Sequence, residues 1–170
     1  MEKEEWKNCL SMLRGGSIEA FETLYEELKT PAYTLILRIT RNTETAEDVL
    51  QEYFLRLFRQ PPPEDVKNPK AYLLGGARNA AIDALRKREA GISLEDAPEI
   101  AEETDLALRT DVETALRRLD GTDCQIVTMH LNAGLTFRET AEIIRMPLGT
   151  VLWRYKRALK ALRKELGGIT

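Results

Sequence analysis

The chain has 170 residues, of which 43% are hydrophobic and 31% charged, and this mixture excludes wholesale disorder. Its net charge of −3 excludes a uniformly basic coat for nucleic acid, so any cationic surface must be local. No apolar stretch is long enough to cross a membrane, and no secretory leader is evident, so we expect a cytoplasmic protein without membrane insertion. The chain has two cysteines far apart in sequence and a single histidine, so we expect no disulfide, metal site or cofactor.

Apolar residues recur at spacings of three and four along most of the chain, which predicts an all-α fold without strands. A first helix around residues 6–13 should end at Gly15 and Gly16, and Ser17 should cap the second. Pro31 is suited to the first turn of a third helix, which would pair with the second as a hairpin. The expected buried positions of the second helix are Phe21, Leu24, Tyr25 and Leu28.

The next predicted helix begins near Thr43 and ends before the prolines at 61–63. Paired apolar residues at 49–50, 53–54 and 57–58 form one stripe about 100° wide, which we expect to be buried. The opposite face carries Asp48, Gln51, Glu52, Leu55 and Arg56.

A long helix should follow from Lys70 to about Glu89, opened by Asn68 as cap and Pro69 in the first turn. Glycines at 75 and 76 weaken its middle. Residues 70–88 include five basic residues and one acidic residue, a net charge of +4. Cationic grooves with stacking side chains bind unpaired bases, so Tyr72, Arg78 and Asn79 form a candidate site. For Tyr72, burial in the core is favoured over a role in binding bases.

A run of six acidic and no basic residues over 95–105 marks a domain boundary. We expect a first domain at 1–90, an acidic linker at 91–110 and a second domain at 111–170. The linker is most simply a solvated tether.

In the second domain, helices are predicted around 112–119, from Thr122, from Thr136 and from Gly149 to Leu166. Thr122 with Gln125, and Thr136 with Glu139, have the spacing of capping boxes. The last two helices are arranged as a helix-turn-helix. Residues 145–165 include seven basic residues and one acidic residue, a net charge of +6. A solvated amphipathic helix would show the same charges, but the preceding capped helix favours a DNA-binding surface.

Three separated segments carry a family resemblance. They are DVLQEYFLR at 48–56, ARNAAID at 77–83 with Arg86, and LTFRETAEII at 135–144 with GTV at 149–151. In order and spacing they resemble the signatures of extracytoplasmic-function (ECF) sigma factors of the sigma-70 family. The similarity covers about 17–89 and 111–166.

The resemblance implies two helical domains, sigma region 2 and sigma region 4, that bind core RNA polymerase (β′ clamp and β flap) and promoter DNA. It also implies regulation by an anti-sigma factor. The implied polymerase-binding residues are Asp48, Gln51, Glu52 and Leu55. Those implied at the −10 element are Lys70, Tyr72, Arg78, Asn79, Arg86, Lys87 and Arg88. Those implied at the −35 element are Thr136, Arg138, Thr150, Trp153, Arg154, Lys156 and Arg157.

The recognition helix departs from the family pattern, because Leu152 and Trp153 stand where polar or basic residues are usual. Trp153 has three equal interpretations: it covers sugar or thymine methyl groups, packs against a partner subunit, or extends the core. Two other functions stay open on the residues alone: a stand-alone helix-turn-helix regulator, and a sigma-like protein that acts by protein contact. An enzyme is not expected, because His130 and the cysteines lack partners at motif spacing.

Overall fold

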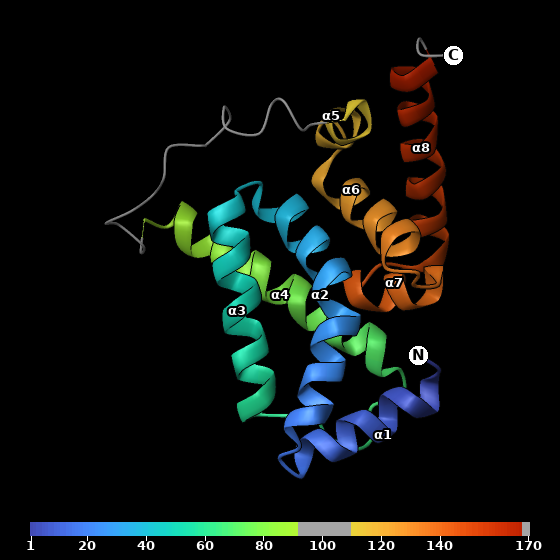
Figure 1. The fold of residues 1–170 in the computed structure, drawn as a ribbon. Helices are drawn as coiled ribbons and strands as arrows, with labels where there is room; N and C mark the ends of the chain where they lie inside the picture. The colour runs from blue at the N-terminus through green and yellow to red at the C-terminus, as the bar shows by residue number, and fades with distance from the viewer. Residues whose placement is uncertain (92–109, 168–170) are drawn as a thin grey trace. The chain divides into compact units, whose positions relative to one another are not determined.

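A computed structural model describes residues 1–91 and 110–167, and every regular element in these ranges is helical, as expected. In chain order the helices are α1 (Lys3–Arg14), α2 (Ile18–Thr40), α3 (Thr43–Arg59), α4 (Pro69–Glu89), α5 (Asp111–Arg117), α6 (Gly121–Val127), the π-helical turn η1 (Thr128–Asn132), α7 (Phe137–Ile144) and α8 (Leu148–Leu166) (Figure 1). They form two compact units, Met1–Arg86 and Lys87–Thr170. The acidic run expected as a linker lies outside the described residues, and the bounds 1–90, 91–110 and 111–170 remain a prediction.

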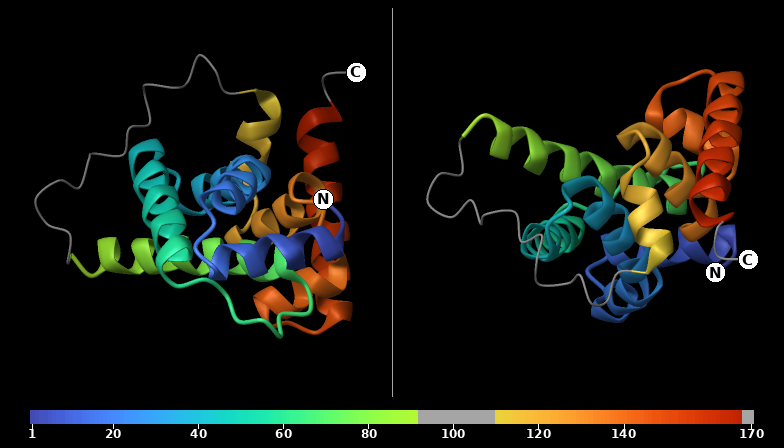
Figure 2. Two further views of the ribbon diagram at one scale, coloured as in Figure 1. Left: turned by 60° about the horizontal axis from the view of Figure 1, so that its bottom comes forward. Right: turned by 90° about the horizontal axis from the view of Figure 1, so that it is seen from above.

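In the first unit, α1 and α3 both pack on α2, and α4 crosses one face of the α2–α3 pair (Figures 1 and 2). The expected start of α2 is confirmed, because the Ser17 hydroxyl accepts a hydrogen bond from the Ala20 amide at 3.1 Å. This cap satisfies one of the amide groups that a helix leaves unpaired at its start. Helix α1 ends as expected before Gly15.

The hairpin expected at Pro31 is wrong, because α2 runs without interruption from Ile18 to Thr40 with Pro31 inside it. Proline at an interior position removes one backbone hydrogen bond and costs about 3 kcal/mol. Burial of apolar side chains outweighs this cost, since they line one side of the helix before and after the proline. The buried apolar residues of α2 are Ala20, Leu24, Leu28, Ala32, Leu35, Ile36 and Ile39.

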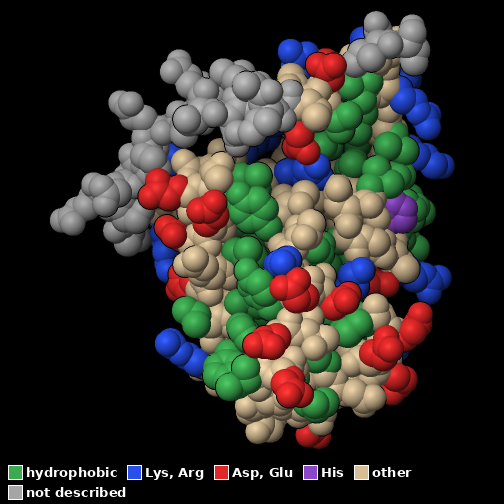
Figure 3. All heavy atoms as spheres, viewed as in Figure 1, with side chains coloured by type: hydrophobic (Ala, Val, Ile, Leu, Met, Phe, Trp, Pro, Cys, Tyr) green, Lys and Arg blue, Asp and Glu red, His purple; other side chains and the backbone are tan. Residues whose placement is uncertain are grey.

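The aromatic residues between α2 and α3 are less buried than expected. Phe21 lies edge-on to Phe54 and Phe58, and Tyr25 lies edge-on to Phe54. Tyr25 and Phe58 nevertheless keep about two fifths of their surface exposed. Figure 3 shows the resulting line of apolar side chains between the two helices. These edge-on pairs join α3 to α2.

Helix α4 approaches α3 closely at Gly76. A Cβ atom at this position would lie 2.7 Å from the Tyr53 hydroxyl oxygen. Tyr53 is buried and donates a hydrogen bond to the Leu73 carbonyl. Gly76 was expected only to weaken α4. In the structure, its lack of a side chain makes room for Tyr53 of α3.

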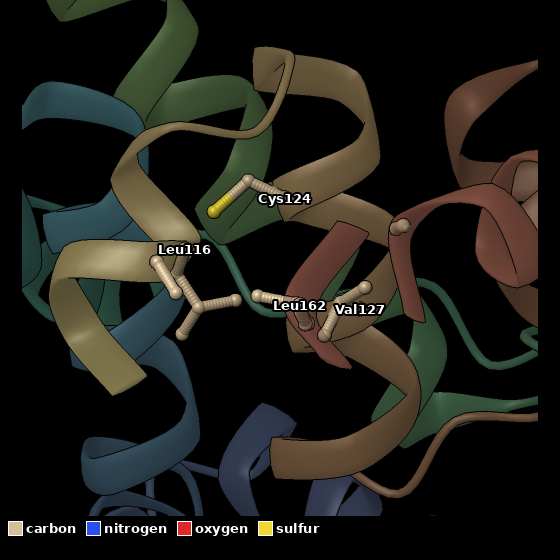
Figure 4. Close-up of a cluster of buried hydrophobic side chains, with 6 residues drawn as sticks. Leu116, Cys124, Val127 and Leu162 are labelled. Carbon is tan, nitrogen blue, oxygen red and sulfur yellow. The ribbon is translucent and has the colours of Figure 1, made fainter. Parts of the chain in front are cut away.

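In the second unit, α5, α6 and α8 share a core (Figure 4). Leu116, Cys124, Val127 and Leu162 converge from the three helices. Both cysteines, Cys9 and Cys124, are buried and are not joined in a disulfide, as expected of small apolar residues. Burial raises the pKa of the Cys9 thiol.

The expected capping box at Thr122 is wrong, because α6 begins earlier. Its cap is Asp120, whose carboxylate accepts from the Thr122 amide at 2.9 Å. The predicted cap at Thr136 is confirmed, because its hydroxyl accepts from the Glu139 amide at 3.1 Å. Arg145 ends α7 in the left-handed conformation, and residues 145–147 form the turn into α8. The helix-turn-helix is therefore present in the structure.

Among the described helices, none combines the length and apolar character needed to cross a membrane.

Candidate nucleic-acid interface

The first surface, which we call the α3 face, consists of Asp48, Gln51, Glu52 and Leu55. All four are exposed, Leu55 by 53% of its surface. They follow one another at helical spacing, opposite Val49, Tyr53 and Leu57, which face the core. Figure 3 shows acidic side chains over the N-terminal half of α3. The core fixes the orientation of this polar face, which suits it to a rigid helix-to-helix contact.

The predicted −10 residues all lie on α4, but they do not form one cluster. Tyr72, Asn79 and Arg86 are exposed and spaced by seven residues, so they form one stripe along the helix. Lys87 is also exposed, whereas Lys70, Arg78 and Arg88 are half-buried. The favoured interpretation of Tyr72 as a core residue is wrong, because 51% of its surface is exposed. The buried positions of α4 are instead Pro69 and the alanines and leucines at 71, 73, 74, 77 and 81.

The third surface, the α8 face, consists of Trp153, Lys156, Arg157 and Lys160. These residues are exposed at helical spacing, opposite the buried Val151, Ala158 and Leu162. Figure 3 shows basic side chains along the outer edge of α8. The result is a cationic face on the second helix of the helix-turn-helix.

The remaining residues predicted for this surface lie near the starts of the two helices. Thr150 is half-buried in the first turn of α8. Thr136 and Arg138 are exposed at the start of α7, where unpaired backbone amides favour a phosphate group.

A buried carboxylate holds the two arginines predicted to contact DNA. Asp123 of α6 is 3% exposed. Its Oδ1 accepts from Arg154 Nη1 at 3.0 Å, and its Oδ2 accepts from Arg157 Nη2 at 2.7 Å and Nε at 3.2 Å. Asp120 lies 3.5 Å from the same Arg154 nitrogen. Arg154 is therefore only partly exposed, and Arg157 about half.

Trp153 lies on the surface beside this ion pair. It is 58% exposed, so its interpretation as an extension of the core is wrong. The guanidinium of Arg157 lies 4.5 Å from the centroid of its ring, which is the geometry of a cation–π contact. Trp153 and Arg157 thus form one stacked pair.

An aromatic cluster orients α7 against α8. The rings of His130 and Phe137 stack at 3.9 Å, and Tyr155 lies edge-on to both. His130 Nδ1 also lies 2.8 Å from the Leu135 carbonyl oxygen across the turn at Gly134. His130 thus has a structural role here, as a helix-face residue.

Sequence reasoning missed Asp123, which lies 31 and 34 positions before its arginine partners. The available signal was weak: one acidic residue directly before the apolar run of α6. No group of histidine, cysteine and acidic side chains suited to a metal ion occurs in the ranges 1–91 and 110–167.

The sequence matches two family models, Sigma-70 region 2 over residues 24–90 and Sigma-70 region 4 over residues 115–164. It is 30% identical to the ECF RNA polymerase sigma factor SigK of Mycobacterium ulcerans (strain Agy99), over 92% of this chain and 91% of that protein. The chain belongs to the ECF sigma factors. SigW of Bacillus subtilis (strain 168), another ECF RNA polymerase sigma factor, is 26% identical over 94% of this chain and 96% of its own length.

Two solved structures have the same fold as this ECF sigma factor. One is the sigma factor RpoE in complex with the anti-sigma factor NepR from Bartonella quintana, with a TM-score of 0.70, 21% identity and coverage of 88% of this chain and 98% of that one. The other is CnrH in complex with the cytosolic domain of CnrY, with a TM-score of 0.72, 19% identity and coverage of 96% and 98%. As an ECF sigma factor, the protein directs RNA polymerase to specific promoters.

Proposed function

We propose that the three surfaces divide the work of promoter recognition. The α3 face binds the β′ clamp of core RNA polymerase, α4 binds the opened −10 element, and the helix-turn-helix binds the −35 element while contacting the β flap. The observation that carries this proposal is that the α3 face, the α4 stripe and the α8 face each lie opposite a buried stripe of the same helix.

The α3 face is suited to a protein partner rather than to DNA. It presents two carboxylates, an amide and an exposed leucine, and DNA phosphates would repel the carboxylates. Leu55, with half its surface in water, adds apolar area to this polar surface.

A charge reversal on this surface tests the proposal. Glu52→Lys should weaken core polymerase binding at least about tenfold, because a desolvated charge of the wrong sign costs several kcal/mol. Glu22→Lys, an exposed position on α2 with the same charge change, should bind core polymerase normally. The readout is the dissociation constant from fluorescence titration, and equal effects of the two substitutions would contradict the assignment.

For the −10 element, Tyr72 and Asn79 are the exposed members of the α4 stripe that offer stacking and base-edge hydrogen bonds. Arg86 and Lys87 supply positive charge for the phosphates. Lys70, Arg78 and Arg88 contribute charge to the same helix.

For the −35 element, the α8 face enters the major groove, with Thr150, Arg154 and Arg157 near bases or phosphates and Lys156 on the backbone. Thr136 and Arg138 bind phosphate at the start of α7. Arg154→Ala combined with Arg157→Ala should abolish dependence of transcription on the −35 sequence. Unchanged transcription would favour a sigma-like protein that acts by protein contact alone.

We infer that an anti-sigma factor regulates this protein, because one similar structure is of a sigma factor in complex with an anti-sigma factor. The other, CnrH, is likewise in complex with another protein, the cytosolic domain of CnrY. Affinity purification from the native host should recover core polymerase together with such a partner. We also propose that the protein acts in the cytoplasm, where transcription takes place, and has no catalytic activity of its own.

A further inference from the structure

We propose that Asp123 is a positioning residue for promoter reading: it fixes Arg154 and Arg157 so that the stacked Trp153–Arg157 pair presents one orientation to the −35 element. This inference rests on the proposed function of the α8 face. It adds a residue outside the helix-turn-helix, on α6, to the determinants of specificity.

The Asp123 carboxylate accepts several hydrogen bonds at once. Both oxygens of Asp123 are used, and Arg157 donates from two of its nitrogens to the same oxygen at 2.7 and 3.2 Å. Contacts through two nitrogens fix the plane of a guanidinium. A lysine ammonium is not planar and could not be oriented in this way. Burial of the carboxylate keeps water from competing for these contacts.

The contacts with Asp123 leave part of the Arg157 guanidinium available to DNA. Arg157 engages Asp123 through Nε and Nη2, which leaves both N–H groups of Nη1 and one N–H of Nη2 outside these two contacts. One face of the guanidinium covers Trp153. Asp123 and Trp153 thus restrain Arg157 from two directions, while 45% of its side chain stays exposed.

The recognition helix has few polar side chains that could read bases. Leucine and tryptophan at 152 and 153 supply no charged donors for base edges. Reading therefore depends on the few arginines nearby, and a long side chain loses less entropy on binding when it is already ordered. An Arg157 side chain that is already ordered before DNA binding therefore compensates for the polar residues that this helix lacks.

The same contacts also have a competing interpretation, because a carboxylate beside a DNA-binding arginine lowers the positive charge of the surface. The two roles predict different results for −35 enrichment by Asp123→Asn. If the carboxylate only lowers the positive charge of the surface, the substitution strengthens DNA binding, and enrichment is retained or increased. If the carboxylate positions the arginines, enrichment falls despite the gain in net positive charge.

The experiment uses holoenzyme assembled from the full-length chain and core RNA polymerase, with a duplex promoter library randomised over the −35 element. The wild-type protein should enrich a defined −35 sequence. Asp123→Asn should lower that enrichment roughly tenfold or more, the loss expected for one good bidentate base contact. Asp111→Asn, the same change at an exposed first-turn position of α5, should retain it.

Thermal unfolding of each variant separates positioning from stability, because a variant that is only less stable retains its sequence preference at a temperature where it is folded. Arg157→Lys provides a second test that does not touch the buried carboxylate. It keeps the charge but cannot keep the two-nitrogen contact, so it too should lose enrichment roughly tenfold.

Retained or increased enrichment by folded Asp123→Asn, or retained enrichment by Arg157→Lys, would overturn the inference alone. If the wild-type protein enriches no −35 sequence, the proposed function of the α8 face is wrong and the inference falls with it.

Discussion

At the scale of single residues, the contact between Gly76 and Tyr53 sets how closely α3 and α4 approach. In Gly76→Ala, the added methyl would meet a buried ring whose hydroxyl is already hydrogen-bonded. The gain in helix propensity is about 1 kcal/mol, and overpacking costs about 1–3 kcal/mol. We expect a net loss of stability in urea unfolding.

Two variants control this prediction. Gly149→Ala meets no atom within 4 Å and should not lower the unfolding free energy. Combining Gly76→Ala with Tyr53→Phe, which removes the nearest oxygen, should recover part of the loss. A stability gain in the single Gly76→Ala variant would show that α3 and α4 separate easily.

Tyr53 should also make the protein sensitive to alkali. Burial raises the pKa of its phenol well above the ordinary value, so the unfolded chain ionises first as pH rises past about 10. The stability associated with neutral Tyr53 is fully present below that pH and is lost above it. Urea unfolding between pH 8 and 11 should show a decline that is shallower in Tyr53→Phe. Identical slopes would contradict the assignment to this residue.

Helical periodicity predicts that Asp48, Gln51 and Glu52 of α3 are exposed. These polar residues lie opposite paired apolar residues, so the helix is stable only with its apolar side toward the core. Periodicity fails for Tyr72 and Trp153, since an aromatic side chain suits both a core and an exposed stacking surface. The role of Asp123 could not be predicted from the sequence for a different reason. An ion pair between residues 31 positions apart depends on how α6 packs against α8, and helical spacing along one segment carries no information about that packing.

At the scale of helices, α2 shows where local signals fail. Proline favours a helix start, yet the apolar pattern on both sides of Pro31 continues in phase, and this continuity was the better predictor. Likewise Asp120 is as good a cap as Thr122, so the start of α6 shifts by a residue or two. The existence of helices was predictable, whereas their ends depend on competition between nearby caps.

Replacing this proline should stabilise the protein. Pro31→Ala restores an interior backbone hydrogen bond and should raise the unfolding free energy by about 1–3 kcal/mol, less the entropy that proline removes from the unfolded chain. Pro147→Ala, at the position before α8 where no such bond is missing, should change stability little. Chemical denaturation provides the measurement. An unchanged or lower midpoint for Pro31→Ala would mean that α2 is adapted to a bend at this residue.

At the scale of the whole molecule, a net charge of −3 accompanies two cationic segments. Repulsion from DNA phosphates should keep the free protein off DNA, so that promoter binding requires core polymerase. We expect the free chain to bind duplex promoter DNA with a dissociation constant weaker than about 1 µM at physiological salt. Mobility-shift assays with and without core polymerase test this. Roughly nanomolar specific binding by the free chain would instead identify a stand-alone regulator.

The uninterrupted course of α2 has a genetic consequence. Because α1 and α3 both pack on this one helix, a substitution that disrupts the packing of α1 should also disturb the α3 face, although it changes no residue of that face. A random-mutagenesis screen for lost promoter activity should therefore recover alleles at Trp6 and Leu10, which are buried in α1, alongside alleles on the α3 face. Overexpression should rescue the former class and leave the latter defective.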